Sequence, residues 1–183
     1  MSLFHYGTPT LQHDKHKSLL DSEHYTVLDI NAGYRSIWRT TLRNHYYGNV
    51  LFIDIRREVK PDILCSNEQL PFKNGTFKTV VYDPPFITKH NPNGTYYKTE
   101  FGKRWWSSKS KSSLLHNVAA VNKEAARVAE NLILKWTDTE VALNTALALL
   151  DKWHLVKQRF HRSKHASKTS ARTTSLSFLS RIV

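Results

Sequence analysis

Val80-Val81-Tyr82-Asp83-Pro84-Pro85-Phe86 joins an apolar, β-branched run to two consecutive prolines. Such a run is typical of a buried strand. Proline has no backbone N–H and a fixed φ, so it cannot continue a central strand. We therefore predict a strand over residues 78–83, which presents an acid, two prolines and an aromatic ring at its carboxyl end.

Further apolar runs lie on both sides of this segment along the chain. They are continuous rather than alternating, which is typical of parallel strands covered on both faces. Helical or irregular segments separate them, as in a doubly wound α/β sheet. The other predicted strands are 25–30, 49–55, 61–64, 131–136, 154–160 and 174–183.

Helical periodicity appears in three places. Residues 36–47 are predicted to form a helix after the first strand. Apolar residues spaced four, three, four, three and four apart predict one face of an amphipathic helix; they are Leu114, Val118, Val121, Ala125, Val128 and Leu132. Thr137 and Glu140 have the spacing of a capping box, which predicts the start of a last helix there. Its apolar face is expected to contain Leu143, Leu147 and Leu150.

The composition predicts one basic domain. The chain has 183 residues and a formal net charge of +12, which favours polyanionic partners, above all nucleic acid. We expect a single domain over 1–183 with an N-terminal extension at 1–24. Cys65 is the only cysteine, which excludes an internal disulfide or a cysteine-based zinc site and fits a cytoplasmic setting. No signal-peptide pattern and no apolar run of about 18 residues is present, so no membrane span is expected. No metal site is expected either.

Residues 87–113 form a long segment that mixes basic and aromatic side chains. Basic side chains meet phosphates and aromatic rings stack on bases. One interpretation is a nucleic-acid-binding loop, and the other is a loop whose tryptophans pack on the core. The candidate nucleic-acid-binding residues are Lys103, Arg104, Trp105, Trp106, Lys109 and Lys111.

Three acids fall at the ends of predicted strands, namely Asp29, Asp54 and Asp83. In an open α/β sheet, ligands bind outside the carboxyl ends of the strands. Asp54 follows Asp29 by 25 positions, near the offset of an acid that binds ribose hydroxyls. The turn between them has the single glycine Gly33, which argues against a pyrophosphate cradle. A nucleoside cofactor without phosphates, such as S-adenosylmethionine, suits this pattern.

The segments VLDINAG, LFIDIR and VVYDPPF resemble the motif series of class I S-adenosylmethionine-dependent amino-methyltransferases of the Asp-Pro-Pro-aromatic type. The resemblance covers about residues 25–183 and is closest to a small phage and prophage family of DNA methyltransferase-like proteins. Phe86 stands where that family often has histidine, and AENLILKW lacks the family's Lys-Pro-x-Gly turn. Further matching positions are Gly33, Arg35, Trp38, Asp54, Arg56, Pro61, Asp62, Leu70, Pro71, Phe72, Lys135 and Trp136.

The resemblance implies a Rossmann-like, doubly wound, mostly parallel seven-stranded sheet with an antiparallel C-terminal strand, and S-adenosylmethionine as cofactor. The implied catalytic residues are Asp83, Pro84, Pro85 and Phe86. The implied cofactor-binding residues are Asp29, Ala32, Gly33, Asp54 and Asp62, and the adenine edge would meet Asp62 or a residue near Asn67-Glu68. The Asp83 carboxylate and the Pro84 carbonyl would accept the two N–H groups of a base amine, and Phe86 would stack on a flipped base.

Three functions fit these expectations. The first is methylation of an exocyclic amine in DNA, at adenine N6 or cytosine N4. The second is methylation of an RNA base, because the chain has no room for a large target-recognition domain. The third is a catalytically silent nucleic-acid-binding module with the same fold.

Overall fold

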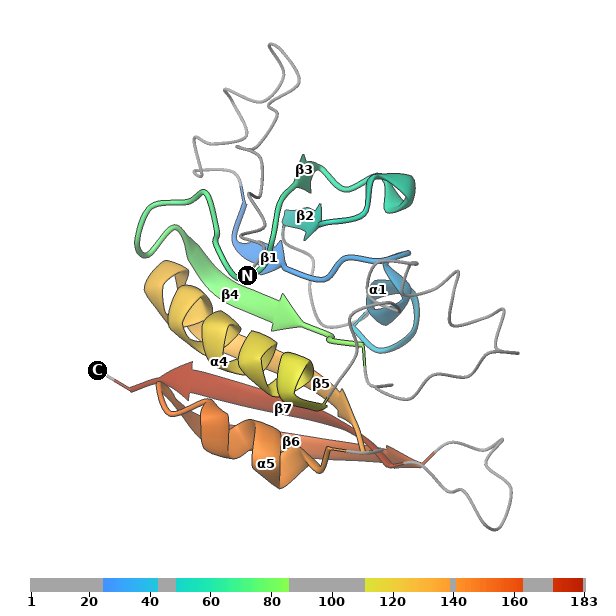
Figure 1. The fold of residues 1–183 in the computed structure, drawn as a ribbon, viewed down its shortest axis with the longest axis vertical. Coiled ribbons are helices and arrows are strands. Elements are labelled where there is room, and N and C mark those ends of the chain that lie inside the picture. The colour runs from blue at the N-terminus through green and yellow to red at the C-terminus, as the bar shows by residue number, and fades with distance from the viewer. Residues whose placement is uncertain (1–24, 43–48, 86–110, 139–140, 163–172, 183) are drawn as a thin grey trace, which may run out of the picture.

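The computed structural model describes residues 25–42, 49–85, 111–138, 141–162 and 173–182. They form a seven-stranded sheet in the order β3-β2-β1-β4-β5-β7-β6 (Figure 1). Strands β1 to β5 pair in parallel, and β7 is antiparallel to both of its neighbours. The predicted fold class is therefore confirmed. The strands are β1 Val27–Asp29, β2 Val50–Asp54, β3 Ile63–Leu64, β4 Phe77–Tyr82, β5 Ala129–Thr137, β6 Trp153–Arg162 and β7 Thr173–Arg181.

Helices cover both faces of the sheet. The helices α4 (Lys111–Val128) and α5 (Leu143–Leu149) lie on the face turned toward the viewer in Figure 1. The short helix α1 (Ser36–Thr40) packs Ile37 on the other face, against Val27 and Val81. A 3-10 turn, η2 (Arg57–Val59), connects β2 to β3. Because successive strand residues point to opposite faces, continuous apolar strands fill both layers.

The helix face predicted in the second half of the chain is correct up to Val128. Leu114, Val118, Val121 and Ala125 are buried in the main core. Leu132, however, lies in β5, because the helix passes directly into the strand at Ala129. The spacing of Leu132 from Val128 matches the helical period by coincidence. A fully buried strand has apolar residues at every position, so one of them also falls at the helical spacing.

The predicted capping box is wrong. Thr137 is the last residue of β5, where its hydroxyl hydrogen-bonds the Thr174 hydroxyl of β7 at 2.9 Å. Helix α5 begins at Leu143, and the Asp138 carboxylate accepts the Leu143 N–H at 2.7 Å. The β5–β7 pairing extends through Thr137 and takes it out of the cap position. Glu140 lies outside the described residues.

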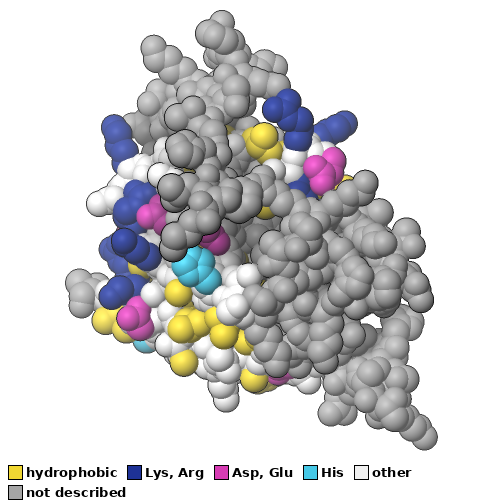
Figure 2. Space-filling view, viewed as in Figure 1, with side chains coloured by type: hydrophobic (Ala, Val, Ile, Leu, Met, Phe, Trp, Pro, Cys, Tyr) yellow, Lys and Arg dark blue, Asp and Glu magenta, His cyan; other side chains and the backbone are white. Residues whose placement is uncertain are grey.

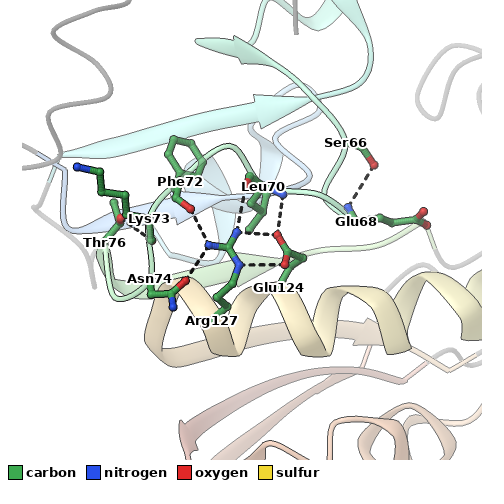
Figure 3. Close-up of polar contacts among 9 residues, drawn as sticks. All are labelled: Ser66, Glu68, Leu70, Phe72, Lys73, Asn74, Thr76, Glu124 and Arg127. Atoms are coloured by element: carbon green, nitrogen blue, oxygen red, sulfur yellow. Dashed lines mark hydrogen bonds and ion pairs between the residues drawn. The ribbon is translucent and has the colours of Figure 1, made fainter. Parts of the chain in front are cut away.

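Arg127, near the end of α4, holds the connection from β3 to β4 onto that helix (Figure 3). Its guanidinium donates to the carbonyl oxygens of Phe72 at 2.6 Å and Leu70 at 2.9 Å, and to the Asn74 side chain at 3.1 Å. Glu124 accepts from Arg127 at 2.7 Å and from the Leu70 N–H at 2.8 Å. The Arg127–Glu124 ion pair thus supplies hydrogen-bond partners to backbone groups of this connection that are part of no strand or helix.

We expect Arg127→Ala to lower the free energy of unfolding by about 2–3 kcal/mol, because hydrogen bonds to charged groups are each worth about 1.5–3 kcal/mol and this ion pair is partly exposed. Urea denaturation measures the loss. The Arg127 hydrogen bond lowers the pKa of Glu124 below its ordinary value of 4.5, so the Glu124 contribution is present above that pH and is lost as the pH falls. A loss that stays the same as the pH falls far below 4.5 contradicts this account.

Candidate active site at the carboxyl edge of the sheet

The three acids predicted at strand ends lie at one edge of the sheet. Asp29 ends the central strand β1, and it pairs with Phe52 of β2 and Val81 of β4. Asp54 and Asp83 each follow those partners by two positions. Since side chains two apart share a face, the register places all three carboxylates on the face that α1 covers. Their proximity also appears in the electrostatics, because the charges of Asp83 and Asp54 raise the pKa of Asp29.

Asp29 is fully buried beneath the turn that follows β1. Its carboxylate accepts the Trp38 indole N–H at 2.6 Å and the Asn31 backbone N–H at 3.1 Å. Burial raises its pKa from 3.8 to about 7, although these two donors lower it. Asp29 therefore supports the turn from below and presents no surface to a ligand.

We expect Asp29 to titrate near pH 7 in the folded protein. Between about pH 4 and 7 the folded state binds a proton that the unfolded chain has released, so this group makes stability fall as the pH rises through that range. Carbon-13 NMR of the carboxyl groups measures the titration, and Asp29→Asn identifies the signal. Trp38→Phe removes a donor that favours the charged form and is expected to move the midpoint to higher pH. A wild-type midpoint near the ordinary value of 3.8 contradicts the prediction.

The turn after β1 is built from two left-handed residues, Gly33 with φ of 48° and Arg35 with φ of 58°. A positive φ is unusual for a residue with a side chain. The Arg35 guanidinium lies 4.1 Å from the centre of the Phe52 ring and 3.7 Å from the Asp62 carboxylate. These contacts fix Arg35 in its left-handed conformation. Two residues of the Gly-x-Arg-x-x-Trp pattern thus hold this turn in place. Arg35 contacts Phe52 and Asp62, and Trp38 donates to Asp29.

Asp54 connects this turn to the end of β2. One carboxylate oxygen accepts the Gly33 N–H at 2.9 Å. The other accepts the Arg56 backbone N–H at 2.9 Å and its Nε–H at 3.2 Å. The Arg56 guanidinium lies over the turn, since a Cβ added to Gly33 would be 3.3 Å from it. Ala32, buried beside Gly33, donates its N–H to the carbonyl of Ile53 at 3.1 Å.

Asp83 follows β4 directly and pairs with Lys135 of β5. The Lys135 ammonium donates to one Asp83 oxygen at 2.6 Å, and 19% of the Asp83 side chain remains exposed. Burial raises the pKa of Asp83, and the Lys135 charge opposes that shift. Pro84 is buried and Pro85 is half-buried. Phe86 lies outside the described residues.

The other predicted site residues lie beside this group or outside the described side chains. Asp62 directly precedes β3, where its carboxylate accepts the Phe52 N–H at 2.9 Å and lies 3.7 Å from the Arg35 guanidinium of the turn. Lys111 is the first residue of α4, but its side chain is not described. The remaining candidates for nucleic-acid binding, Lys103, Arg104, Trp105, Trp106 and Lys109, lie outside the described residues.

A chain of buried amides that the sequence did not reveal adjoins the turn. The Tyr82 hydroxyl donates to Asn117 at 2.7 Å, Asn117 donates to Asn67 at 2.9 Å, and Asn67 donates to Asn31 at 2.9 Å. Glu68 also accepts from Asn117, at 2.7 Å. These residues come from four separate segments, so no local spacing could have indicated their contact. They join α4 and the β3–β4 connection to the turn after β1.

Basic side chains are not confined to the candidate site. Figure 2 shows Lys and Arg gathered along one side of the α4–α5 face, where the amino ends of β4 and β5 lie in Figure 1. Within the described ranges, no group of three or more His, Cys, Asp and Glu could hold a metal ion, and no helix is long and apolar enough to cross a membrane.

Comparison with solved structures identifies the fold. No family model matches the chain, and no curated protein matches its sequence. An S-adenosylmethionine-dependent methyltransferase from Methanosarcina mazei superposes with a TM-score of 0.52 and 12% identity, over 86% of this chain and 92% of its own. A protein from Pyrococcus horikoshii proposed to be an RNA methyltransferase gives 0.51 and 12%, over 92% and 80%.

Geranyl diphosphate C-methyltransferase from Streptomyces coelicolor, in complex with Mg²⁺, geranyl diphosphate and S-adenosyl-L-homocysteine, gives a TM-score of 0.52 and 8% identity, over 90% of this chain and 77% of its own. The protein therefore has the fold of class I S-adenosylmethionine-dependent methyltransferases. At these identities the likeness concerns the fold, and the neighbours named above include one proposed to act on RNA and one bound to geranyl diphosphate.

Proposed function

We propose that this protein is an S-adenosylmethionine-dependent methyltransferase that acts on an exocyclic amino group of a nucleobase, with adenine N6 of DNA as the first candidate and cytosine N4 as the second. The observation that carries the proposal is the position of Asp83-Pro84. In a methyltransferase fold, this acid follows β4 at the same edge and face as Asp29 and Asp54, and Pro84 comes directly after it.

The residues at this edge suit a nucleoside cofactor. Gly33 has no Cβ, and it lies beside the Asp54 carboxylate. A carboxylate is the type of group that binds two ribose hydroxyls. A carboxylate has about four acceptor sites, and Gly33 and Arg56 together use four. Rotation of the Arg56 side chain would free the two that its guanidinium occupies. When bound, S-adenosylmethionine would supply the electrophilic methyl group.

The protein's contribution at the amine is positioning. The nitrogen lone pair of a base amine is delocalised into the ring, so the amine is a poor nucleophile. The Asp83 carboxylate and the Pro84 carbonyl would accept its two N–H groups and draw the nitrogen toward tetrahedral geometry, with the lone pair facing the methyl donor. As the N–C bond formed and the methyl–sulfur bond of the cofactor broke, the nitrogen would lose a proton, which the Asp83 carboxylate would accept. Pro85 holds the backbone rigid, and Phe86 would stack on the flipped base.

The net charge of +12 supports a nucleic-acid substrate. The 87–113 segment, with Trp105, Trp106 and its basic residues, would bind the strand near the target base. Methylation of an RNA base is the second candidate function, and a neighbour of this fold is itself proposed to be an RNA methyltransferase. The third is a silent nucleic-acid-binding module, which is favoured by the engagement of Asp54 with Arg56.

One experiment separates the three candidates. The protein is incubated with S-adenosylmethionine carrying a tritiated methyl group and with DNA or RNA separately, and the nucleic acid is then digested and its nucleosides analysed by mass. We expect N6-methyladenine from DNA. Label in RNA alone selects the RNA enzyme. Absence of label from both, with no cofactor binding by calorimetry, selects the silent module and contradicts the proposal.

A further inference from the structure

The ion pair between Lys135 and Asp83 joins two neighbouring parallel strands at the candidate site. Val81 pairs with Ile133 and Tyr82 with Leu134, so the next positions bring Asp83 beside Lys135. Their charged atoms are 2.6 Å apart, and the side chains are 19% and 23% exposed. Lys135 donates to one oxygen, Oδ2, and no other described residue donates to the carboxylate. Asp83 therefore has one oxygen directed by Lys135 and a second that can accept from a ligand.

The groups around Asp83 show why its ionisation depends on Lys135. From β1 the site is faced by Asp29, and from β2 by Asp54, whose charge is paired with Arg56. From β5 it is faced by Lys135, whereas α1 contributes the uncharged Trp38. Burial favours the protonated form of Asp83, and Lys135 is the described cation that opposes this effect. A protonated Asp83 would present a donor to the amine instead of an acceptor.

We propose that Lys135 is a positioning residue for the methyl-transfer step, which keeps the Asp83 carboxylate ionised and oriented so that its second oxygen accepts an N–H of the substrate amine. This inference rests on the proposed function. It implies that the Asp-Pro-Pro segment acts only while Lys135, on the neighbouring strand β5, keeps Asp83 ionised and oriented. Lys135 itself touches neither the methyl group nor the base.

The test compares Lys135→Met with Lys135→Arg, which keeps the charge. Lys152→Met is the matched control, because Lys152 forms an exposed pair with Asp151 at 3.9 Å, outside the candidate site. Methyl transfer to a single-stranded adenine-containing oligodeoxynucleotide is measured from pH 5 to 9. Activity needs ionised Asp83, so it falls as the pH drops through the pKa of that group. We expect Lys135→Met to move this acid limb upward by about one to three pH units, as expected for loss of an adjacent opposite charge.

The variants Lys135→Arg and Lys152→Met separate positioning from folding. Lys135→Arg is expected to keep the acid limb of the wild type while lowering the maximal rate, because the guanidinium retains the charge but moves the donor. Lys152→Met is expected to change neither. If Lys135→Met does not fold, as judged by circular dichroism, Lys135→Arg alone decides: an unchanged maximal rate with an unchanged limb overturns the proposal. An unshifted limb in folded Lys135→Met overturns it as well.

A second measurement does not depend on activity. The Asp83 carboxyl is followed by carbon-13 NMR, with Asp83→Asn to identify its signal, in wild type and Lys135→Met. A midpoint that rises in the variant supports the assigned role of Lys135, and an unchanged midpoint contradicts it. If the wild type methylates no nucleic acid but the midpoint rises, the proposed substrate fails while the action of Lys135 on Asp83 stands.

Discussion

Replacement of Asp83 by alanine is expected to lower methyl transfer by about a thousandfold or more, while cofactor affinity remains within about threefold of the wild type. Removal of one pre-organised polar group from a reacting centre costs about a hundred- to a thousandfold in rate. Asp83 would supply one of two acceptors for the amine, and its loss also leaves the Lys135 ammonium without its partner. That cation would then face the amine and repel the positive charge that develops on nitrogen.

Three measurements check the expectation. Tritium transfer gives the rate, titration calorimetry gives the cofactor affinity, and circular dichroism shows that the variant folds. Asp151→Asn is the matched control, because Asp151 is an exposed acid that forms its own lysine pair away from this edge. Transfer by Asp83→Ala at more than a tenth of the wild-type rate would remove Asp83 from the mechanism. A parallel loss of cofactor affinity would instead assign Asp83 to the cofactor site.

Strand positions could be predicted because they depend on local physics. Continuous apolar runs such as 49–55 and 78–83 mark strands buried on both faces, and prolines mark an end. Once the strands are parallel and adjacent, the acids at their ends must meet at one edge, so Asp29, Asp54 and Asp83 come together without any knowledge of side-chain contacts.

The failures occur where tertiary pairing overrides a local pattern. Thr137 has the spacing of a cap, but strand pairing with β7 extends through it, and Asp138 caps the helix instead. The pair of Asp83 with Lys135 depends on which strands are neighbours, which the positions of single residues in the chain do not give.

Replacement of Asp54 by alanine is expected to weaken S-adenosylmethionine binding by about a hundredfold or more. Two ribose hydroxyls would donate to this carboxylate, and each hydrogen bond to a charged group is worth about 1.5–3 kcal/mol. The variant also loses the acceptor that holds the Gly33 N–H and hence the shape of the turn. Titration calorimetry measures the affinity, and the free protein must keep its circular dichroism spectrum for the result to count.

Arg56→Met gives the opposite expectation at the same site. The Arg56 guanidinium competes for the Asp54 oxygens that ribose would use, and it lies against the Gly33 turn. Because methionine removes that competitor but keeps an apolar stem of similar length, the variant is expected to bind the cofactor as tightly as the wild type or severalfold more tightly. The test is the contrast between the two variants. If Asp54→Ala and Arg56→Met weaken cofactor binding equally, the two residues act as one structural pair, and ribose does not bind Asp54. If neither changes it, the cofactor does not occupy this end of β2.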